Sequence, residues 1–309
     1  MSTHDGHVPA SRVALGFAAV YILWGSTYLG IRFAVASLPP LFMAGTRYLI
    51  AGALLYVLMR RLGAAKPTLQ HWKSAALLGV LLLLGGNGLV SMAEQTVPSG
   101  IAALIVAAVP FWMVLLNAAE QRTAPKPYVL MGLVLGIVGL GILVLPGAGS
   151  VPDHVSPAGV AILLTATVSW AVGSLYAHRA PLPSSTFLGI AMEMLAGGAA
   201  LWAASFLSGE GAALHLAGAT AKSWIALGYL VIFGSLLGFS AYVWLLKVTT
   251  PARASTYAFV NPVIAVFLGW ALAGEAVTAR VALAGGIIVA AVCLILYFGA
   301  ARKPAEQKT

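Results

Sequence analysis

Polar side chains recur inside the long apolar runs of this sequence, at spacings that place them on common helix faces. Asn87, Ser91 and Glu94 are four and three residues apart, so on a helix they share one face. Tyr257 and Asn261 share a face in the same way. An amide or carboxylate is costly against lipid, so we expect these faces to turn inward, toward protein or water. The alternative for each is an ordinary interhelical hydrogen bond, worth ~0.6 kcal/mol on average.

Two prolines, Pro110 and Pro262, lie in the middle of apolar runs. A proline removes one helical hydrogen bond and frees a carbonyl one turn earlier. In lipid such a carbonyl needs a partner, so we expect both positions to line a wet cavity or buried protein. A packing kink with no further role is the alternative.

Aromatic side chains form a third group of candidates, because Trp and Tyr in membrane proteins usually lie at the interfaces. Here they lie within or near the centres of apolar runs, at Trp24, Tyr28, Trp112, Trp170, Tyr176, Tyr242 and Tyr257. Rings in such places suit a ligand with an apolar or aromatic body, or a cation held over a ring face. Helix packing is the alternative, with each N–H and O–H satisfied by a neighbouring helix.

The elements that carry these residues are predicted to be membrane spans. Of the 309 residues, 61% are apolar and only 8% are charged, whereas soluble domains carry about 25% charged residues. These proportions exclude a soluble enzyme, a nucleic-acid-binding protein and a disordered chain. The sequence has no cluster with metal-ligand spacing and no phosphate-binding loop, so we expect no metal, no cofactor and no enzymatic activity.

Ten apolar runs can each cross a hydrocarbon core of ~30 Å as a helix. They fall at about 13–37, 39–60, 72–95, 98–119, 128–146, 157–178, 184–208, 223–247, 252–274 and 279–300. With the N-terminus inside, Lys and Arg gather at the cytoplasmic ends of the runs, and only Lys222 and Arg280 lie at outer ends. The positive-inside rule therefore places both termini in the cytoplasm.

The two halves of the chain repeat one pattern. Gly-Ser-Thr-Tyr at 25–28 in the first run corresponds to Gly-Ser-Leu-Tyr at 173–176 in the sixth. Each half has five runs, and an odd number of spans inverts the second half relative to the first, as in many secondary transporters. The sequence thus predicts an all-α membrane protein of ten transmembrane helices, built as two inverted five-helix repeats at 12–147 and 157–300.

Charges inside the runs need partners, since a charge at mid-bilayer costs at least ~2.5–3.5 kcal/mol on insertion scales. Glu94 and Lys247 each stand four residues before a proline, at matching places in the two halves. Arg47 and Glu193 likewise each follow a phenylalanine by five or six residues. We therefore expect ion pairs Arg47–Glu94 toward the outside and Glu193–Lys247 toward the inside, acting either as gates that break alternately or as static struts.

Two further motifs are quite specific. Val-Pro-Ser-Gly-Ile-Ala-Ala at 97–103 and Tyr-Ala-Phe-Val-Asn-Pro-Val at 257–263 resemble the EamA family of the drug/metabolite transporter superfamily, and within it the YedA-like branch of exporters. The resemblance covers about residues 12–300. It implies a ten-helix permease of the bacterial inner membrane with a cavity between the halves. It does not imply one substrate, because the superfamily carries amino acids, amines, sugars and nucleotide sugars.

We therefore expect a secondary transporter that exports small metabolites or drugs by alternating access, with amino acids and amphipathic cations among the candidates. Asn87, Trp112, Tyr242, Tyr257 and Asn261 are expected to contact the substrate. A passive channel and an intramembrane enzyme are the alternatives. The expected partners are the lipid bilayer and a small-molecule substrate, with no nucleic acid; the oligomeric state, a dimer included, stays open.

Overall fold

The computed structural model of the chain describes residues 9–122, 124–125, 127–144, 155–210, 218–249 and 256–299. These residues form helices that follow the predicted runs. In order, the helices are α1 (Ala10–Gly25), α2 (Thr27–Ala34), α3 (Pro40–Arg61), α4 (Leu69–Leu78), η1 (Gly79–Gly88), α5 (Leu89–Ala93), α6 (Ser99–Val106), α7 (Val109–Gln121), α8 (Pro127–Val144), α9 (Pro157–Ala177), α10 (Thr186–Leu207), α11 (Ala221–Tyr229), η3 (Leu230–Leu237), α12 (Gly238–Val248), α14 (Tyr257–Ala273) and α15 (Ala279–Gly299). The segments η1 and η3 are π-helical.

In the described residues the helical segments group into ten apolar rods, each made of the helices of one predicted run. These ten rods confirm the predicted fold class. Within the described residues, seven rods are long and apolar enough to cross a membrane, and three apolar helices, α8, α14 and α15, are shorter there. Large apolar side chains cover the outside of the molecule, including Ile137, Ile225, Phe267 and Leu272. Such a surface would be an aggregation hazard in water, and it is the surface that lipid requires.

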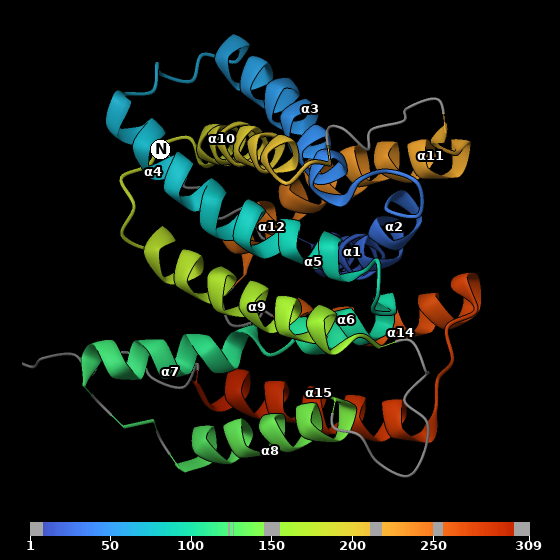
Figure 1. Cartoon of the computed structure of the whole chain (residues 1–309). Coiled ribbons are helices and arrows are strands. Elements are labelled where there is room, and N and C mark those ends of the chain that lie inside the picture. The colour runs from blue at the N-terminus through green and yellow to red at the C-terminus, as the bar shows by residue number, and fades with distance from the viewer. Residues whose placement is uncertain are drawn as a thin grey trace, which may run out of the picture.

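The helices form two walls between two helix pairs (Figure 1). One pair is α3 and α10, and the pair at the opposite side of the molecule is α8 and α15. The first wall contains α1, α12 and α14, and the second contains η1, α5, α7 and α9. Each wall takes helices from both halves of the chain. The family resemblance implies a cavity between the two halves, whereas in the structure the halves are intertwined around it.

The walls meet at the end of the molecule that the charge pattern predicts to be outside. There α6 packs against both α2 and α14. Two helices that begin at this end, α3 and α6, have a proline at the N-cap position and no side-chain cap of their own. Glutamates distant in sequence supply the missing acceptors. Glu275 accepts from Ser99 N (2.8 Å) and Gly100 N (3.0 Å), and Glu210 accepts from the first amides of α3.

A carboxylate at a helix N-terminus is stabilised by the exposed N–H groups and by the helix dipole. Glu210 follows α10 and binds α3, whereas Glu275 follows α14 and binds α6. Each contact therefore joins a helix of the first half to a segment of the second half. Together they fasten the two halves at the predicted outer end.

Two of the rods are interrupted near their middle. The first rod breaks at Ser26, between α1 and α2, and the fourth breaks between α6 and α7. Pro110 stands in the first turn of α7, directly after that break, where a missing N–H costs nothing. Pro262, in contrast, lies inside an unbroken α14. The matching prolines thus do not give matching interruptions.

Glycines allow η1 and α10 to approach at backbone distance. A Cβ on Gly79 would lie 2.5 Å from Gly197 N, and a Cβ on Gly197 would lie 2.8 Å from Gly79 O. Small residues at such crossings let helix backbones touch and gain van der Waals contact, which substitutes for the hydrophobic effect in lipid. Gly228 on α11 is a natural contrast, since a Cβ there would meet nothing within 4 Å.

We predict opposite effects for the same substitution at these two glycines. Gly79→Ala should lower the free energy of unfolding by ~1–3 kcal/mol, because backbone cannot move aside as a flexible side chain can. Gly228→Ala should leave it unchanged or raise it by up to ~1 kcal/mol, because alanine favours a helix. Unfolding of the purified protein in mixed detergent micelles measures both. Equal stability of the two variants would contradict the close packing.

Candidate functional site

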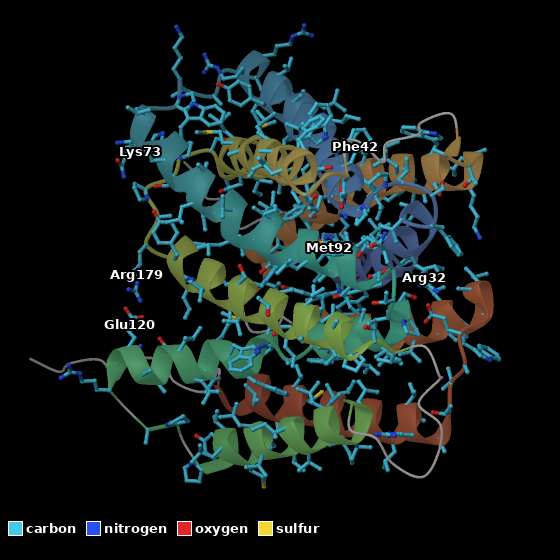
Figure 2. The ribbon with its side chains drawn as sticks, in the orientation of Figure 1. Arg32, Phe42, Lys73, Met92, Glu120 and Arg179 are labelled. Atoms are coloured by element: carbon cyan, nitrogen blue, oxygen red, sulfur yellow. The ribbon has the colours of Figure 1, made fainter. Side chains whose placement is uncertain are left out.

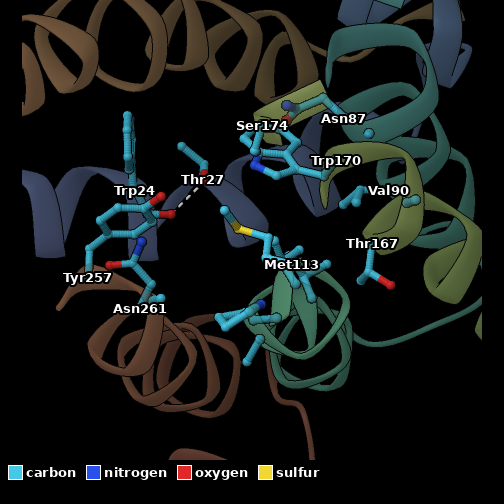
Figure 3. A pocket seen from close by; sticks show the side chains of 18 of the residues that line it. Trp24, Thr27, Asn87, Val90, Met113, Thr167, Trp170, Ser174, Tyr257 and Asn261 are labelled. Carbon is cyan, nitrogen blue, oxygen red and sulfur yellow. Dashed lines mark hydrogen bonds between the residues drawn. The ribbon is translucent and has the colours of Figure 1, made fainter. Parts of the chain in front are cut away.

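A cavity of about 970 Å³ lies between the two walls. One end is formed by Arg47 and Tyr48, and the other by Asn117, His178 and Arg179 at the ends of α7 and α9. Its volume is typical of sites for small molecules, as is its mostly apolar lining with few polar groups. Figure 3 shows Trp24, Tyr257 and Asn261 on one side and Asn87, Trp170 and Ser174 on the other.

The cavity brings together most of the predicted site residues. Its lining includes Trp24, Tyr28, Arg47, Asn87, Pro110, Trp170, Tyr242, Tyr257, Asn261 and Pro262. Among the described residues, three of the predicted substrate-binding candidates are not in the lining, and neither are the predicted charge-pair residues Glu94 and Glu193. Ser91 is buried and donates to the carbonyl of Asn87 one turn earlier, a common fate of serine in membrane helices. Trp112 donates to Thr167 Oγ1 across 2.8 Å, and Tyr176 lies half-buried near the end of α9.

Other lining residues escaped the sequence analysis. Met113 and Asn117 lie three and seven residues after Pro110 on α7 and extend one face toward the cavity mouth. Thr27 and Ser174 belong to the repeated Gly-Ser stretches. Helical spacing from Pro110 could have identified the first two. The repeat alone could not separate Thr27 and Ser174 from serines that only pack.

An aromatic cluster lines one side of the cavity. The ring of Trp24 lies 4.9 Å from that of Tyr257, 5.1 Å from that of Tyr242 and 5.3 Å from that of Phe239. The edge-to-face arrangement of Trp24 against Tyr257 and Phe239 suits the ring quadrupoles and fixes the cluster. The cluster therefore presents a rigid apolar surface to any molecule that enters the cavity.

Both π-helical segments supply carbonyls to the opposite repeat. Trp24 Nε1 donates to Gly234 O in η3 across 3.2 Å, and Ser169 Oγ donates to Leu81 O in η1 across 2.7 Å. Trp24 directly precedes the Gly-Ser stretch of the first half, and Ser169 precedes that of the second half by four residues. The sequence pattern does not predict these π-helical segments. Glycines cluster at these segments, at 85, 86 and 88 in η1, at 234 in η3 and at 238 directly after η3.

Arg47 is buried, with 4% of its surface exposed, and reaches the closed end of the cavity. Its Nε donates to Ser235 Oγ across 2.8 Å, and its guanidinium carbon lies 4.8 Å from the centre of the Tyr48 ring. The expected ion pair with Glu94 is not formed in this structure. Arg47 turns to η3 instead, because Ser235 offers a hydroxyl at a helix crossing.

Glu94 is fully buried, and neither oxygen of its carboxyl group has a hydrogen-bond partner in the described part of the chain. The nearby cation Arg32 donates to the backbone carbonyl of Glu94 across 2.7 Å, not to its side chain. An ionised carboxylate without partners is costly away from water. The second expected pair lies partly outside the described residues, because the side chain of Lys247 is among those not described; Glu193 is half-buried on α10.

A different ion pair marks the open end of the cavity. Glu120 at the end of α7 and Arg179 after α9 face each other there, and both are exposed (Figure 2). Exposed pairs contribute little to stability because water and salt screen them. The pair nevertheless cancels the charge of Arg179 at the cavity mouth.

We predict that thermodynamic coupling follows the observed partner of Arg47. In a double-mutant cycle with Arg47→Gln, Ser235→Ala should show a coupling of ~1.5–3 kcal/mol, as expected for a hydrogen bond to a charged group. Glu94→Gln in the same cycle should show coupling within ~0.5 kcal/mol of zero. Unfolding in mixed micelles gives both values. A stronger coupling of Arg47 to Glu94 than to Ser235 would restore the strut hypothesis.

Comparison with known proteins agrees with this architecture. The chain is 43% identical over 279 residues to the "Uncharacterized inner membrane transporter YedA" of Escherichia coli K12, covering 90% of this chain and 88% of that protein. It is 25% identical to a "Probable amino-acid metabolite efflux pump" of Salmonella typhimurium, with 92% and 95% covered. A solved structure titled "Crystal structure of protein" has a TM-score of 0.61 at 22% identity and covers 93% of this chain and 98% of its own, which supports the fold.

The sequence model of one family matches the chain twice, over residues 11–145 and 157–297. The two matches leave out little more than the termini and the segment between the fifth and sixth rods. The chain therefore belongs to the EamA-like transporter family.

Proposed function

We propose that this membrane transporter is a secondary carrier that exports small metabolites across the bacterial inner membrane by alternating access. The observation that carries the proposal is the shape of the cavity. It is sealed where α6 meets α2 and α14, and it is open where α7 and α9 end. The names of the relatives in Escherichia coli and Salmonella, an inner membrane transporter and an efflux pump, support the location in the inner membrane and the outward direction of transport.

In this proposal the two repeats, at 12–147 and 157–300, are inverted relative to each other. Both termini are cytoplasmic, so the open end of the cavity faces the cytoplasm, where metabolites are loaded. Because inverted repeats can exchange conformations, the same chain can close this end and open the other. Aromatic and amide side chains at the centre, Trp24, Tyr257, Asn87 and Asn261, would contact the cargo in both states.

A passive channel is a weaker candidate, because the closed end is packed with buried side chains. Ile31, Ile101 and Ile105 are each at most 4% exposed, and Glu275 fastens α6 at this end. The carboxyl of Glu210 likewise fastens the start of α3. A channel needs a path that is continuous from side to side, whereas a carrier needs one end closed at a time.

Counterflow separates the two possibilities. Proteoliposomes are loaded with a concentrated, unlabelled mixture of metabolites and diluted into buffer that contains trace amounts of the same metabolites with an isotope label. The label that accumulates inside the liposomes is measured by mass spectrometry. A carrier should transiently concentrate one class of labelled compound, and the rate should saturate. Label that never rises above equilibrium, or efflux that stays linear with concentration, would favour a channel. Liposomes without protein are the control.

A further inference from the structure

We propose that Arg47 holds the carboxylate of the transported molecule, and that this molecule is an apolar or aromatic monocarboxylate whose body lies against Trp24, Tyr242 and Tyr257. The inference deepens the transport function proposed above and rests on it.

The cavity lining is cationic. Among the described lining residues none is acidic, and the two arginines are Arg47 at the closed end and Arg179 at the mouth. Arg179 is neutralised by Glu120. Arg47 forms no ion pair with any carboxylate of the described part of the chain. A buried cation without a counter-anion is unfavourable, so an anion that enters the cavity gains from meeting Arg47.

Arg47 has donor groups without a hydrogen-bond partner in the described part of the chain. Its Nε is engaged by Ser235, and one face of the guanidinium lies near the Tyr48 ring, so the fork of Nη1 and Nη2 is the remaining donor set. Two parallel N–H groups match the two oxygens of a carboxylate. A single unpaired cation also matches a monoanion better than a phosphate dianion, which would need further positive charge.

The surface beside this fork is the aromatic cluster. Gly234 links the two, because its carbonyl accepts from Trp24 Nε1 and a methyl group on it would lie 2.9 Å from Arg47 Nη2. One small molecule can therefore touch the guanidinium and the rings of Trp24, Tyr242 and Tyr257 together. The same electrostatics disfavours the amphipathic cations that the sequence left open, because their charge would face Arg47.

A ligand series with one body and three head groups tests the assignment. The probes are 3-phenylpropionate, its amide 3-phenylpropanamide, and the cation phenethylamine. Their binding to the purified full chain in nanodiscs is measured by calorimetry. The acid should bind, the amide should bind about tenfold more weakly or worse, and the amine should not compete with the acid. Equal affinities of acid and amide, or no binding of the acid at millimolar concentration, would overturn the proposal.

Variants separate recognition from a purely structural role of Arg47. Arg47→Gln should abolish the preference for acid over amide, and Arg47→Lys should keep part of it, because the charge remains without the planar fork. Arg61→Gln is the matched control, because Arg61 is exposed at the end of the same helix α3 and outside the cavity lining, and this variant should keep the full preference. An undiminished preference in folded Arg47→Gln would overturn the proposal, and the wild-type series decides the matter if that variant does not fold.

The metabolite-pool experiment distinguishes the two levels of inference. Saturable counterflow that carries only amines or neutral compounds would leave the transporter function standing and remove the carboxylate assignment. Absence of counterflow for every compound would instead remove the proposed carrier function.

Discussion

Carbonyls in two π-helical segments hold the cavity walls in place. In a bilayer every backbone polar group needs a partner inside the protein, and a wide helical turn can offer its carbonyl to a neighbouring helix. Gly234 accepts from the indole of Trp24, and Leu81 accepts from the hydroxyl of Ser169. Each bond ties a rod of one repeat to a rod of the other. The bond to Gly234 also fixes Trp24 of the aromatic cluster beside Arg47.

Charge is distributed around this frame with a clear asymmetry. At the closed end, carboxylates bind helix N-termini whose own caps are prolines, so the negative charges of Glu210 and Glu275 are satisfied by N–H groups. At the open end, Glu120 and Arg179 satisfy each other in water. Between them Arg47 has only a hydroxyl and a ring. Arg47, at the closed end of the cavity, therefore has no counter-ion among the described residues.

The sequence predicts the fold well because lipid imposes a simple code. Runs of about twenty apolar residues become helices, and the repeated Gly-Ser stretches and matched prolines reveal two related halves. Amide side chains inside such runs are costly against lipid, and Trp and Tyr there need partners for their N–H and O–H groups. Most of those predicted for a site therefore line the cavity. The predicted sidedness, the inversion of the repeats and the roles of these residues stay predictions.

What the sequence does not reveal depends on tertiary contacts. The repeat matches Arg47 with Glu193 and Glu94 with Lys247 by position, and from this we expect an Arg47–Glu94 pair. The partner of an arginine is decided by the helix that crosses it, however, and here that helix is η3 with Ser235. Pro262 keeps its helix intact, whereas Ser26 ends one, because a break depends on the neighbours that accept the freed groups. The roles of Glu210 and Glu275 could have been suspected, since prolines at 39 and 98 leave two helix starts without caps.

Solvent access at the two ends of the cavity tests the central claim most directly. The only native cysteine, Cys293, is replaced by alanine, and single cysteines are placed at Asn117 in the open mouth and at Ile101 in the closed end. A membrane-impermeant maleimide should label position 117 from the cytoplasmic side only and leave 101 unlabelled. Added transported metabolite should slow labelling at 117 and permit labelling at 101 from the outside. Labelling of 117 from both sides, or no reciprocal change, would contradict alternating access.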